Sequence, residues 1–231
     1  EDAGAMGFEL NFGCPHGMTE RGMGAAVGQD PEIAKMVVEW VMEKATIPVI
    51  TKLTPNVHSV VPTGRAAVEG GTNALSLINT IQSVTGIDLD TLVPNPFVAG
   101  QSVFGGYCGP AVKPIALKML TTIAQDPLTS KVPVSGIGGV STWKDAVEFM
   151  LLGSTTVQVC TAAMNHGFRI VEDMCEGLNN WIDEKGYATI NDFIGKSVEK
   201  ITHWEDLDIN YHHIAKINQD KCIHCGLCYI A

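Results

Sequence analysis

Cys14 occupies a position where a chain can hold a reactive thiol. The apolar run 8–12 predicts a buried strand, Gly13 interrupts it, and Pro15 follows the cysteine directly. A thiol between a glycine and a proline at the carboxyl end of a strand has a defined place, and in (β/α) barrels this end of the strands carries the chemistry. The alternative is that Cys14 is only a small buried hydrophobic residue, because most buried cysteines are inert.

Polar residues also end two further predicted strands. Lys52 lies in the apolar strand expected over 48–53, and Asn79 with Thr80 ends the strand expected over 74–79. A lone buried ammonium is costly, so we expect an anionic partner for Lys52. Each residue has an ordinary alternative, since a lysine can face solvent and an asparagine can close a turn. If the strands are parallel, these side chains converge with Cys14 at one mouth.

Small residues follow the last two predicted strands. Gly138 and Gly139 come after the strand expected over 133–137, and Cys160 and Thr161 after the one over 155–160. Many barrels bind a phosphate at these strand ends through backbone N–H groups, and glycine lets a ligand approach the backbone. A tight turn is the alternative for the glycines. The pattern predicts a phosphorylated cofactor or substrate.

Three cysteines near the end of the sequence have metal-ligand spacing. Cys222, Cys225 and Cys228 form C-x2-C-x2-C, three-quarters of the run that binds a ferredoxin-type [4Fe–4S] cluster. The fourth ligand would come after Ala231. A zinc site is an alternative, but zinc usually takes two separated C-x2-C pairs; a chance triplet is another. We expect iron–sulfur ligands that act in a longer chain.

The elements that must position these residues alternate between strand and helix. We expect strands over 8–12, 48–53, 74–79, 133–137 and 155–160, and helices that begin at 30–31 and span 60–69, 111–124, 141–152 and 167–184. Near-continuously apolar strands indicate parallel strands buried on both faces. The Gly- and Pro-rich stretch 80–110 predicts a long functional loop without regular structure. No G-x-G-x-x-G follows a strand, which disfavours a dinucleotide-binding doubly wound domain. The fold class expected is α/β, the C-terminal part of a (β/α)8 TIM barrel.

Composition narrows the function further. The 231 residues carry a net charge of −10 without a basic block, which argues against nucleic acid and an anionic membrane surface as partners. No apolar run reaches the ~18 residues of a membrane span. Seven cysteines, three of them within seven residues, do not suit a secreted disulfide framework, so we expect a reducing, cytoplasmic location. The chain opens on Glu1 and closes just after the cysteine triplet, so we expect an internal fragment of a longer protein.

Six segments together carry a resemblance to a known family. They are ELNFGCPHGMTERGMG (9–24), KLTPN (52–56), INT (78–80), GGYCGPAVKPIAL (105–117), SGIGGV (135–140) and QVCTA (158–162). These segments resemble the dihydropyrimidine dehydrogenases, best the catalytic subunits of the bacterial NAD-dependent enzymes, within the dihydroorotate dehydrogenase-like FMN barrels. One departure is Gly13, where related enzymes often carry a serine.

The resemblance implies roles for the residues singled out above. It makes Cys14 the catalytic acid/base and places Lys52 against the flavin. It assigns the pyrimidine ring to Asn11, Asn79 and Thr80. The residues that it implies for holding FMN are Gly109, Gly138, Gly139, Cys160 and Thr161. Asparagine amides suit a neutral ring of alternating N–H and C=O groups, because each amide offers a donor and an acceptor.

The activity implied is the reversible reduction of the 5,6 double bond of uracil or thymine in pyrimidine catabolism. Hydride comes from flavin N5 and a proton from Cys14. Electrons come from NADH through [4Fe–4S] clusters and an NADH/FAD-binding partner subunit, so we expect a hetero-oligomer. The main alternative is a dihydroorotate dehydrogenase-type FMN enzyme, whose substrate carboxylate needs a cation such as Arg21. An electron-transfer module, or an aldolase with Lys52 as a Schiff-base lysine, are the others.

The expected domain organisation has three parts. Residues 1–186 form the C-terminal portion of the FMN-binding barrel, and residues 187–219 form a linker that packs on it. Residues 220–231 begin a truncated ferredoxin-like 4Fe–4S domain.

Overall fold

The computed structural model describes residues 3–14, 22–211 and 216–227 of the chain. The chain divides into two compact units, Glu1–Lys200 and Ile201–Ala231. The first holds the strands and α-helices described below; the second contains 3-10 turns at Trp204–Asp206 and Gln219–Lys221. None of the helices in the described ranges combines the length and apolar character that a membrane crossing demands.

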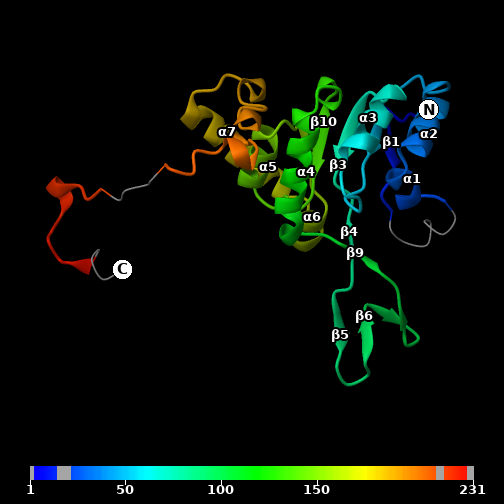
Figure 1. The fold of residues 1–231 in the computed structure, drawn as a ribbon, viewed down its shortest axis with the longest axis horizontal. Helices are drawn as coiled ribbons and strands as arrows, with labels where there is room; N and C mark the ends of the chain where they lie inside the picture. Colours follow the sequence, from blue (N-terminus) through cyan, green and yellow to red (C-terminus); the bar gives the residue numbers. More distant parts are fainter. Residues whose placement is uncertain (1–2, 15–21, 212–215, 228–231) are drawn as a thin grey trace. The chain divides into compact units, whose positions relative to one another are not determined.

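Five parallel strands form the central sheet, in the order β1-β2-β3-β10-β11 (Figure 1). Their bounds are Phe8–Asn11, Val49–Lys52, Ala74–Leu77, Val134–Ile137 and Thr156–Gln158. Each lies inside a strand that the sequence predicted, and all neighbours pair in parallel. The expected α/β class with a parallel sheet is therefore confirmed.

Helices connect and cover these strands. They are α1 (Ala25–Gln29), α2 (Pro31–Met42), α3 (Val61–Glu69), α4 (Lys113–Gln125), α5 (Trp143–Leu151), α6 (Thr161–His166) and α7 (Ile170–Lys185), with 3-10 turns at Pro110–Val112, Thr129–Lys131, Ile190–Asp192 and Val198–Lys200. Asp30 caps α2 as predicted, because its carboxylate accepts the N–H groups of Glu32 and Ile33. The sequence did not predict the short helices α1 and α6.

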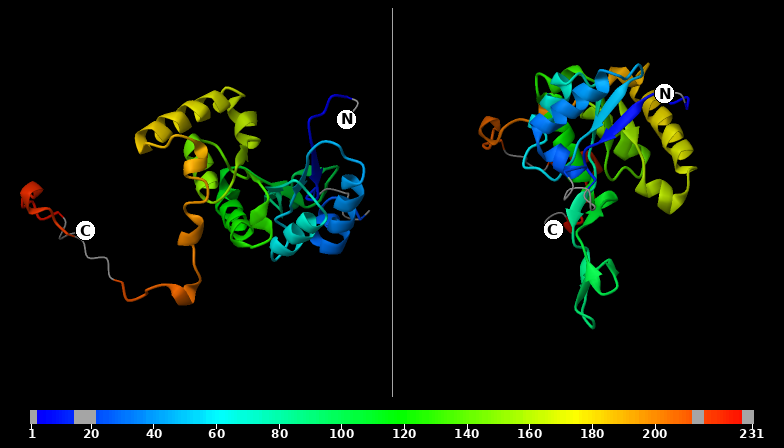
Figure 2. Two further views of the ribbon diagram at one scale, coloured as in Figure 1. Left: turned by 90° about the horizontal axis from the view of Figure 1, so that it is seen from above. Right: turned by 90° about the vertical axis from the view of Figure 1, so that its right-hand side faces the viewer.

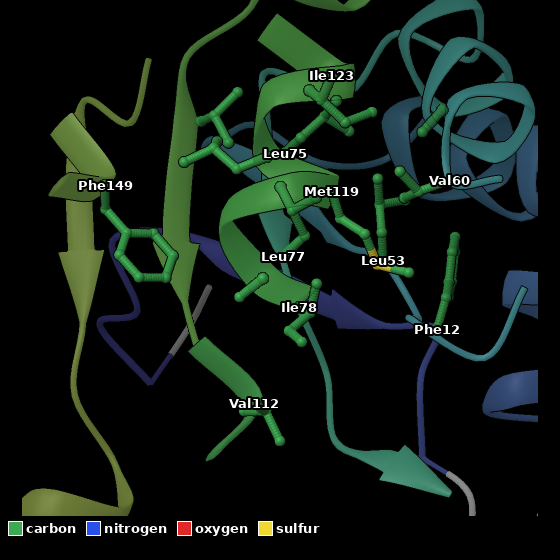
Figure 3. Packing of buried hydrophobic residues seen from close by; sticks show 14 of the residues in the cluster. Phe12, Leu53, Val60, Leu75, Leu77, Ile78, Val112, Met119, Ile123 and Phe149 are labelled. Carbon is green, nitrogen blue, oxygen red and sulfur yellow. The ribbon is translucent and has the colours of Figure 1, made fainter. Parts of the chain in front are cut away.

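The core lies between one face of the sheet and the helices. Leu75 and Leu77 of β3 are fully buried against Met119 and Ile123 of α4, and Phe149 of α5 is fully buried beside β10 (Figure 3). Successive residues of a strand point to opposite faces. The other face accordingly carries Glu9, Lys52, Ser76, Ser135 and Gln158, one from each strand. The strands are thus apolar on the helix-covered face and polar on the other, where the sequence predicted apolar burial on both.

The stretch 80–110, predicted to lack regular structure, forms an arm of short antiparallel pairs. These are β4 (Ile81–Ser83) with β9 (Gly105–Tyr107), β5 (Gly86–Asp88) with β6 (Val93–Asn95), and β7 (Phe97–Val98) with β8 (Gln101–Ser102). The arm points away from the sheet (Figures 1 and 2). The prediction was wrong because strands of two or three residues are too short to show an alternating pattern.

Residues 187–200, which follow α7, pack against α7 and the end of α5. Phe193 is fully buried, its ring edge-on to Trp181 at 5.0 Å and 5.4 Å from Tyr187. Backbone hydrogen bonds from Gly195 to Met150 (2.9 Å) and from Ser197 to Leu151 (3.0 Å) tie the segment to the end of α5. Residues 187–200 are therefore part of the folded unit rather than an extended connection.

Acid should weaken the contact between Arg65 of α3 and Asp126. The guanidinium donates to Asp126 Oδ2 from Nε at 2.9 Å and from Nη2 at 2.5 Å, and lowers the pKa of this carboxyl to about 2. Because the folded pKa is depressed, the stabilisation is present above the unfolded value of ~3.9 and is lost as the pH falls toward 2. Half of the Arg65 side chain faces solvent, so we expect the small contribution to stability of a solvent-screened ion pair.

The measurement is urea denaturation at pH 7, 4 and 2. Asp126→Asn should lose that stability at pH 7 and show a smaller further loss on acidification than the parent. Asp90→Asn, on the exposed arm, is the control and should match the parent. Equal acid sensitivity in the parent and Asp126→Asn would contradict the assignment.

Candidate active site

A cavity opens at the carboxyl ends of the parallel strands. It holds about 640 Å³ of space, part of it open to solvent. Eight residues that the sequence predicted for the site line it: Lys52, Asn79, Thr80, Gly109, Gly138, Gly139, Cys160 and Thr161. Tyr107 and Cys108 from the base of the arm complete one wall, and Cys108 Sγ accepts a hydrogen bond from Thr161 Oγ1 at 3.3 Å. The predicted convergence of these residues is thus present in the structure.

One end of the cavity is made of backbone. Within the described ranges, the N–H groups of Gly138, Gly139 and Val140 donate to no protein acceptor. Gly138 (φ 133°) and Gly139 (φ 77°) have backbone conformations that favour glycine. A Cβ on Gly139 would also lie 2.8 Å from the carbonyl oxygen of Gly109. Consecutive unpaired N–H groups without side chains form a concave anion site, so this end fits a phosphate.

An ion pair holds the turns around this end together. Lys113, the first residue of α4, donates from Nζ to Asp145 of α5 at 2.6 Å and lies 2.8 Å from Glu148. Hydrogen bonds to Asp145 and Glu148 raise the pKa of Lys113. Asp145 also accepts the N–H of Ser141, the residue that follows the unpaired N–H groups. The backbone that follows Val140 is therefore fastened to α5, and α5 is fastened to α4 through Lys113.

The predicted anionic partner of Lys52 is Glu9. Lys52 Nζ lies 3.2 Å from Glu9 Oε1, and the lysine side chain is 17% exposed. The second oxygen, Oε2, accepts from Ser76 Oγ at 3.0 Å and from Gln158 Nε2 at 2.9 Å. Gln158 donates in turn to Ser135 Oγ at 3.1 Å. All five parallel strands contribute to this network, because alternate residues of each strand share one face.

Glu9 is ionised in this network. Burial raises the pKa of its carboxyl, but hydrogen bonds from Gln158 and Ser76 and the charge of Lys52 together outweigh burial and lower it. The pair therefore places one negative and one positive charge side by side, and its lysine lines the cavity.

Two asparagines form a second polar group beside Lys52. Asn11 Oδ1 accepts from Asn79 Nδ2 at 2.5 Å and from the N–H of Gly13 at 3.1 Å. Asn79 Oδ1 accepts the N–H of Thr80 at 2.7 Å. Each amide is thus oriented by its neighbours, and Asn11 keeps its Nδ2 group for a ligand among the residues that the structure describes.

Cys14 comes three residues after Asn11, but in the described part of the chain it does not line the cavity. It is half-buried, and its carbonyl oxygen accepts the N–H of Ala25 at 3.0 Å, which joins it to the start of α1. Residues 15–21, which include Arg21, lie outside the described residues. The backbone of Cys14 is thus fixed to the start of α1, three residues after Asn11.

Sequence reasoning missed three residues that build this site: Glu9, Gln158 and Asn56. Asn56 donates from Nδ2 to the carbonyl oxygen of Thr80 at 3.1 Å and accepts the N–H of Gln82 at 2.8 Å, so it fastens the base of the arm. Glu9 lies two residues before Asn11, and that spacing alone places both on one face of a strand. A charged residue at such a position was the available signal.

The predicted metal ligands lie in the second unit. Cys222 is half-buried and Cys225 is exposed, whereas Cys228 is outside the described residues. Among the residues described, no group of three His, Cys, Asp or Glu side chains could hold a metal ion. The structure therefore does not test the predicted cluster.

Comparison with known proteins defines the class to which this fold and cavity belong. A family model described as dihydroorotate dehydrogenase matches residues 4–182. The chain belongs to the dihydroorotate dehydrogenase family.

The individual relatives are more specific. The chain is 42% identical over its whole length to the NAD-dependent dihydropyrimidine dehydrogenase subunit PreA of Escherichia coli, of which it covers 56%. It is 45% identical over 90% of its length to the chloroplastic NADP(+) dihydropyrimidine dehydrogenase of Arabidopsis thaliana, of which it covers 49%. It is 39% identical over 84% of its length to the catalytic subunit of dihydroorotate dehydrogenase B from Pyrococcus abyssi, of which it covers 62%. The resemblance drawn from the sequence is confirmed, and the chain spans about half the length of the first two relatives.

The close contact between Gly13 and Asn79 can be tested by substitution. A Cβ on Gly13 would lie 2.4–2.6 Å from Asn79 side-chain atoms, so even alanine must displace this amide. We expect Gly13→Ala to lose about 1–3 kcal/mol of unfolding free energy, as overpacking does. Gly86→Ala on the arm, where a Cβ meets nothing within 4 Å, is the matched control and should be near neutral in the same urea titration. Similar values for both variants would show that Asn79 does not lie over Gly13.

Proposed function

We propose that this chain is part of a flavin-dependent oxidoreductase that interconverts uracil or thymine with the 5,6-dihydropyrimidine. The observation that carries the proposal is the cavity, whose lining brings together a backbone anion site, Lys52 and Asn79, with Asn11 hydrogen-bonded to Asn79. Family membership and the two dihydropyrimidine dehydrogenase relatives support it.

The residues present fit FMN. The unpaired N–H groups of Gly138 and Gly139 would hold its phosphate, and Gly109, Cys160 and Thr161 also line the cavity. Lys52 would lie against the ring system, where an ammonium favours developing negative charge. When bound, FMN supplies the hydride of the reaction; the protein supplies position, electrostatics and the proton.

The proton is assigned to Cys14. Reduction of a conjugated C=C bond needs a proton on the carbon opposite the one that receives hydride, and a thiol is suited to give it near neutral pH. Cys14 follows Gly13, whose N–H is bound by Asn11, so the thiol and the Asn11 amide come from one short segment. Asn11, Asn79 and Thr80 would orient the ring beside it.

Replacing this thiol gives a direct test. We expect Cys14→Ala to bind FMN like the parent but to lose ~10²–10⁴-fold in kcat, because an acid/base group is missing. Flavin absorbance after gel filtration measures binding, and oxidation of NADH with uracil measures turnover. Cys175→Ala, an exposed thiol on α7, is the control and should keep parent activity. Turnover within a few-fold of the parent in Cys14→Ala would remove this residue from the mechanism.

The substrate follows from the charges near the amides. In the described part of the site Lys52 is paired with Glu9, so it is not available as a dedicated cation for a carboxylate. Burying an unpaired carboxylate is costly, and a site built to bind a neutral ring should reject one. We expect kcat/KM for uracil to exceed that for orotate by at least ~100-fold.

The measurement compares uracil and orotate side by side in the full-length enzyme with NADH and its electron-donating subunit. The second candidate function is dihydroorotate dehydrogenase activity, which the Pyrococcus relative favours. Orotate used as well as uracil or better would establish that function instead, and would leave the fold and flavin proposals in place.

The parallel sheet is proposed to close into a (β/α)8 barrel in the longer protein. β1 and β11 are the edge strands of the described sheet, each with one parallel neighbour, so further strands could pair with both. In this organisation residues 1–186 belong to the FMN barrel and residues 187–219 to a linker that packs on it. Residues 220–231 begin a ferredoxin-like domain.

Electron supply is proposed to pass through this ferredoxin-like domain. Cys222, Cys225 and Cys228 would be three ligands of a [4Fe–4S] cluster, fed by NADH through an NADH/FAD-binding partner subunit of a hetero-oligomer. Cluster thiolates suit a reducing compartment, hence a cytoplasmic enzyme.

In the full-length protein we expect iron and labile sulfide, and Cys225→Ser should lose the iron and sulfide of about one cluster. Cys108→Ser is the control. Zinc without labile sulfide would end this proposal.

A further inference from the structure

We propose that Glu9 is a positioning residue that opposes the charge of Lys52 and thereby lowers the reduction potential of the flavin. The inference rests on the proposed function, since it concerns FMN in the cavity beside Lys52. It is carried by the contacts of Glu9, which no other carboxylate of the described site reproduces.

Glu9 is held from three strands. Oε1 lies 3.2 Å from Lys52 Nζ, and Oε2 accepts from Ser76 at 3.0 Å and from Gln158 at 2.9 Å. Its side chain is 32% exposed on the polar face of the sheet, and two of its partners, Lys52 and Gln158, line the cavity. A carboxylate with both oxygens engaged has one fixed position, so its distance to Lys52 is also fixed.

This contact changes what Lys52 can do. A half-buried ammonium alone would attract negative charge strongly at the low local dielectric of a protein. With an ionised carboxylate at 3.2 Å, the pair is neutral, and only the unequal distances of its two charges from the flavin leave a net effect. Glu9 therefore fixes the lysine in place and at the same time weakens its field.

The consequence concerns the two oxidation states of FMN. Uptake of two electrons and one proton leaves the ring with one additional negative charge. Lys52 favours that state and Glu9 disfavours it. An enzyme that runs a reversible reaction needs a flavin that accepts hydride and also gives it back, and the Glu9–Lys52 pair moderates the preference for the reduced form.

Three variants test the sign of each charge in the FMN-loaded full-length protein. The midpoint potential is measured by spectroelectrochemical titration at pH 7, and the affinity for oxidised FMN by fluorescence. Glu9→Gln should bind reduced FMN about tenfold more tightly relative to oxidised FMN, which is a rise of about 30 mV for a two-electron couple. Lys52→Met should shift the potential downward. The double variant Lys52→Met/Glu9→Gln should lie above Lys52→Met.

Two controls isolate the position of the charge. Glu39→Gln removes a carboxylate from the exposed face of α2, where it pairs loosely with Lys35 at 4.0 Å, and should leave the potential unchanged. Glu9→Asp keeps the charge and should stay near the parent. If Glu9→Gln does not fold because it leaves Lys52 without a counter-charge, the double variant, which leaves no unpaired charge, decides the question against Lys52→Met alone.

The outcomes separate the two proposals. A protein that binds no flavin overturns the proposed function. A protein that binds FMN, with potentials for Glu9→Gln at or below the parent, or with a double variant no higher than Lys52→Met, overturns the role of Glu9 and leaves the proposed function standing.

Discussion

The parallel register of the five strands is the constraint on which the site depends. Asn11 stands opposite Lys52, Lys52 opposite Ser76, and Ser76 opposite Ser135. Because side chains alternate along a strand, this register puts a row of polar groups on one face and Leu75, Leu77 and Val134 on the other. A slip of one residue in any strand would bury the polar groups among the helices and expose the core. Fold stability and site assembly are therefore selected together.

The strand register does not shape the turns that follow the strands; glycine residues do. The strands end where the backbone must turn outward, and the turn at Gly138–Gly139 leaves N–H groups beside the cavity without an acceptor among the described residues. Side chains at these points would collide with Ala116 and with the Gly109 carbonyl. The absence of a side chain is thus as much a part of this site as Lys52 or Asn79.

The sequence predicted eight of the residues that line the cavity, because most of them lie at strand ends, where hydrophobic periodicity stops and glycine or a polar residue follows. Lys52, Asn79 and Gly138–Gly139 were identified in this way, and the need of a buried lysine for an anion was correct. Glu9 was missed although it was that anion, because a charged residue inside a short apolar run was treated as part of the strand. The sequence around Glu9 does not identify Lys52, 43 positions further on, as its partner. The pairing of β1 with β2 brings the two residues together. The arm was missed because its strands, of two or three residues each, are too short to show an alternating hydrophobic pattern.

Asn56 determines how the arm is attached to the sheet. Its side chain hydrogen-bonds to the backbone on both sides of Ile81, at the point where the arm leaves the sheet. From there β4 and β9 pair as far as Ser83 and Gly105. Beyond Ser83 and Gly105, the strands of the arm pair with one another, β5 with β6 and β7 with β8. The arm is therefore free to lengthen, shorten or change sequence over evolutionary time while Thr80 and Tyr107 stay in the wall of the cavity, which makes it the place where this scaffold can diversify without disturbing its chemistry.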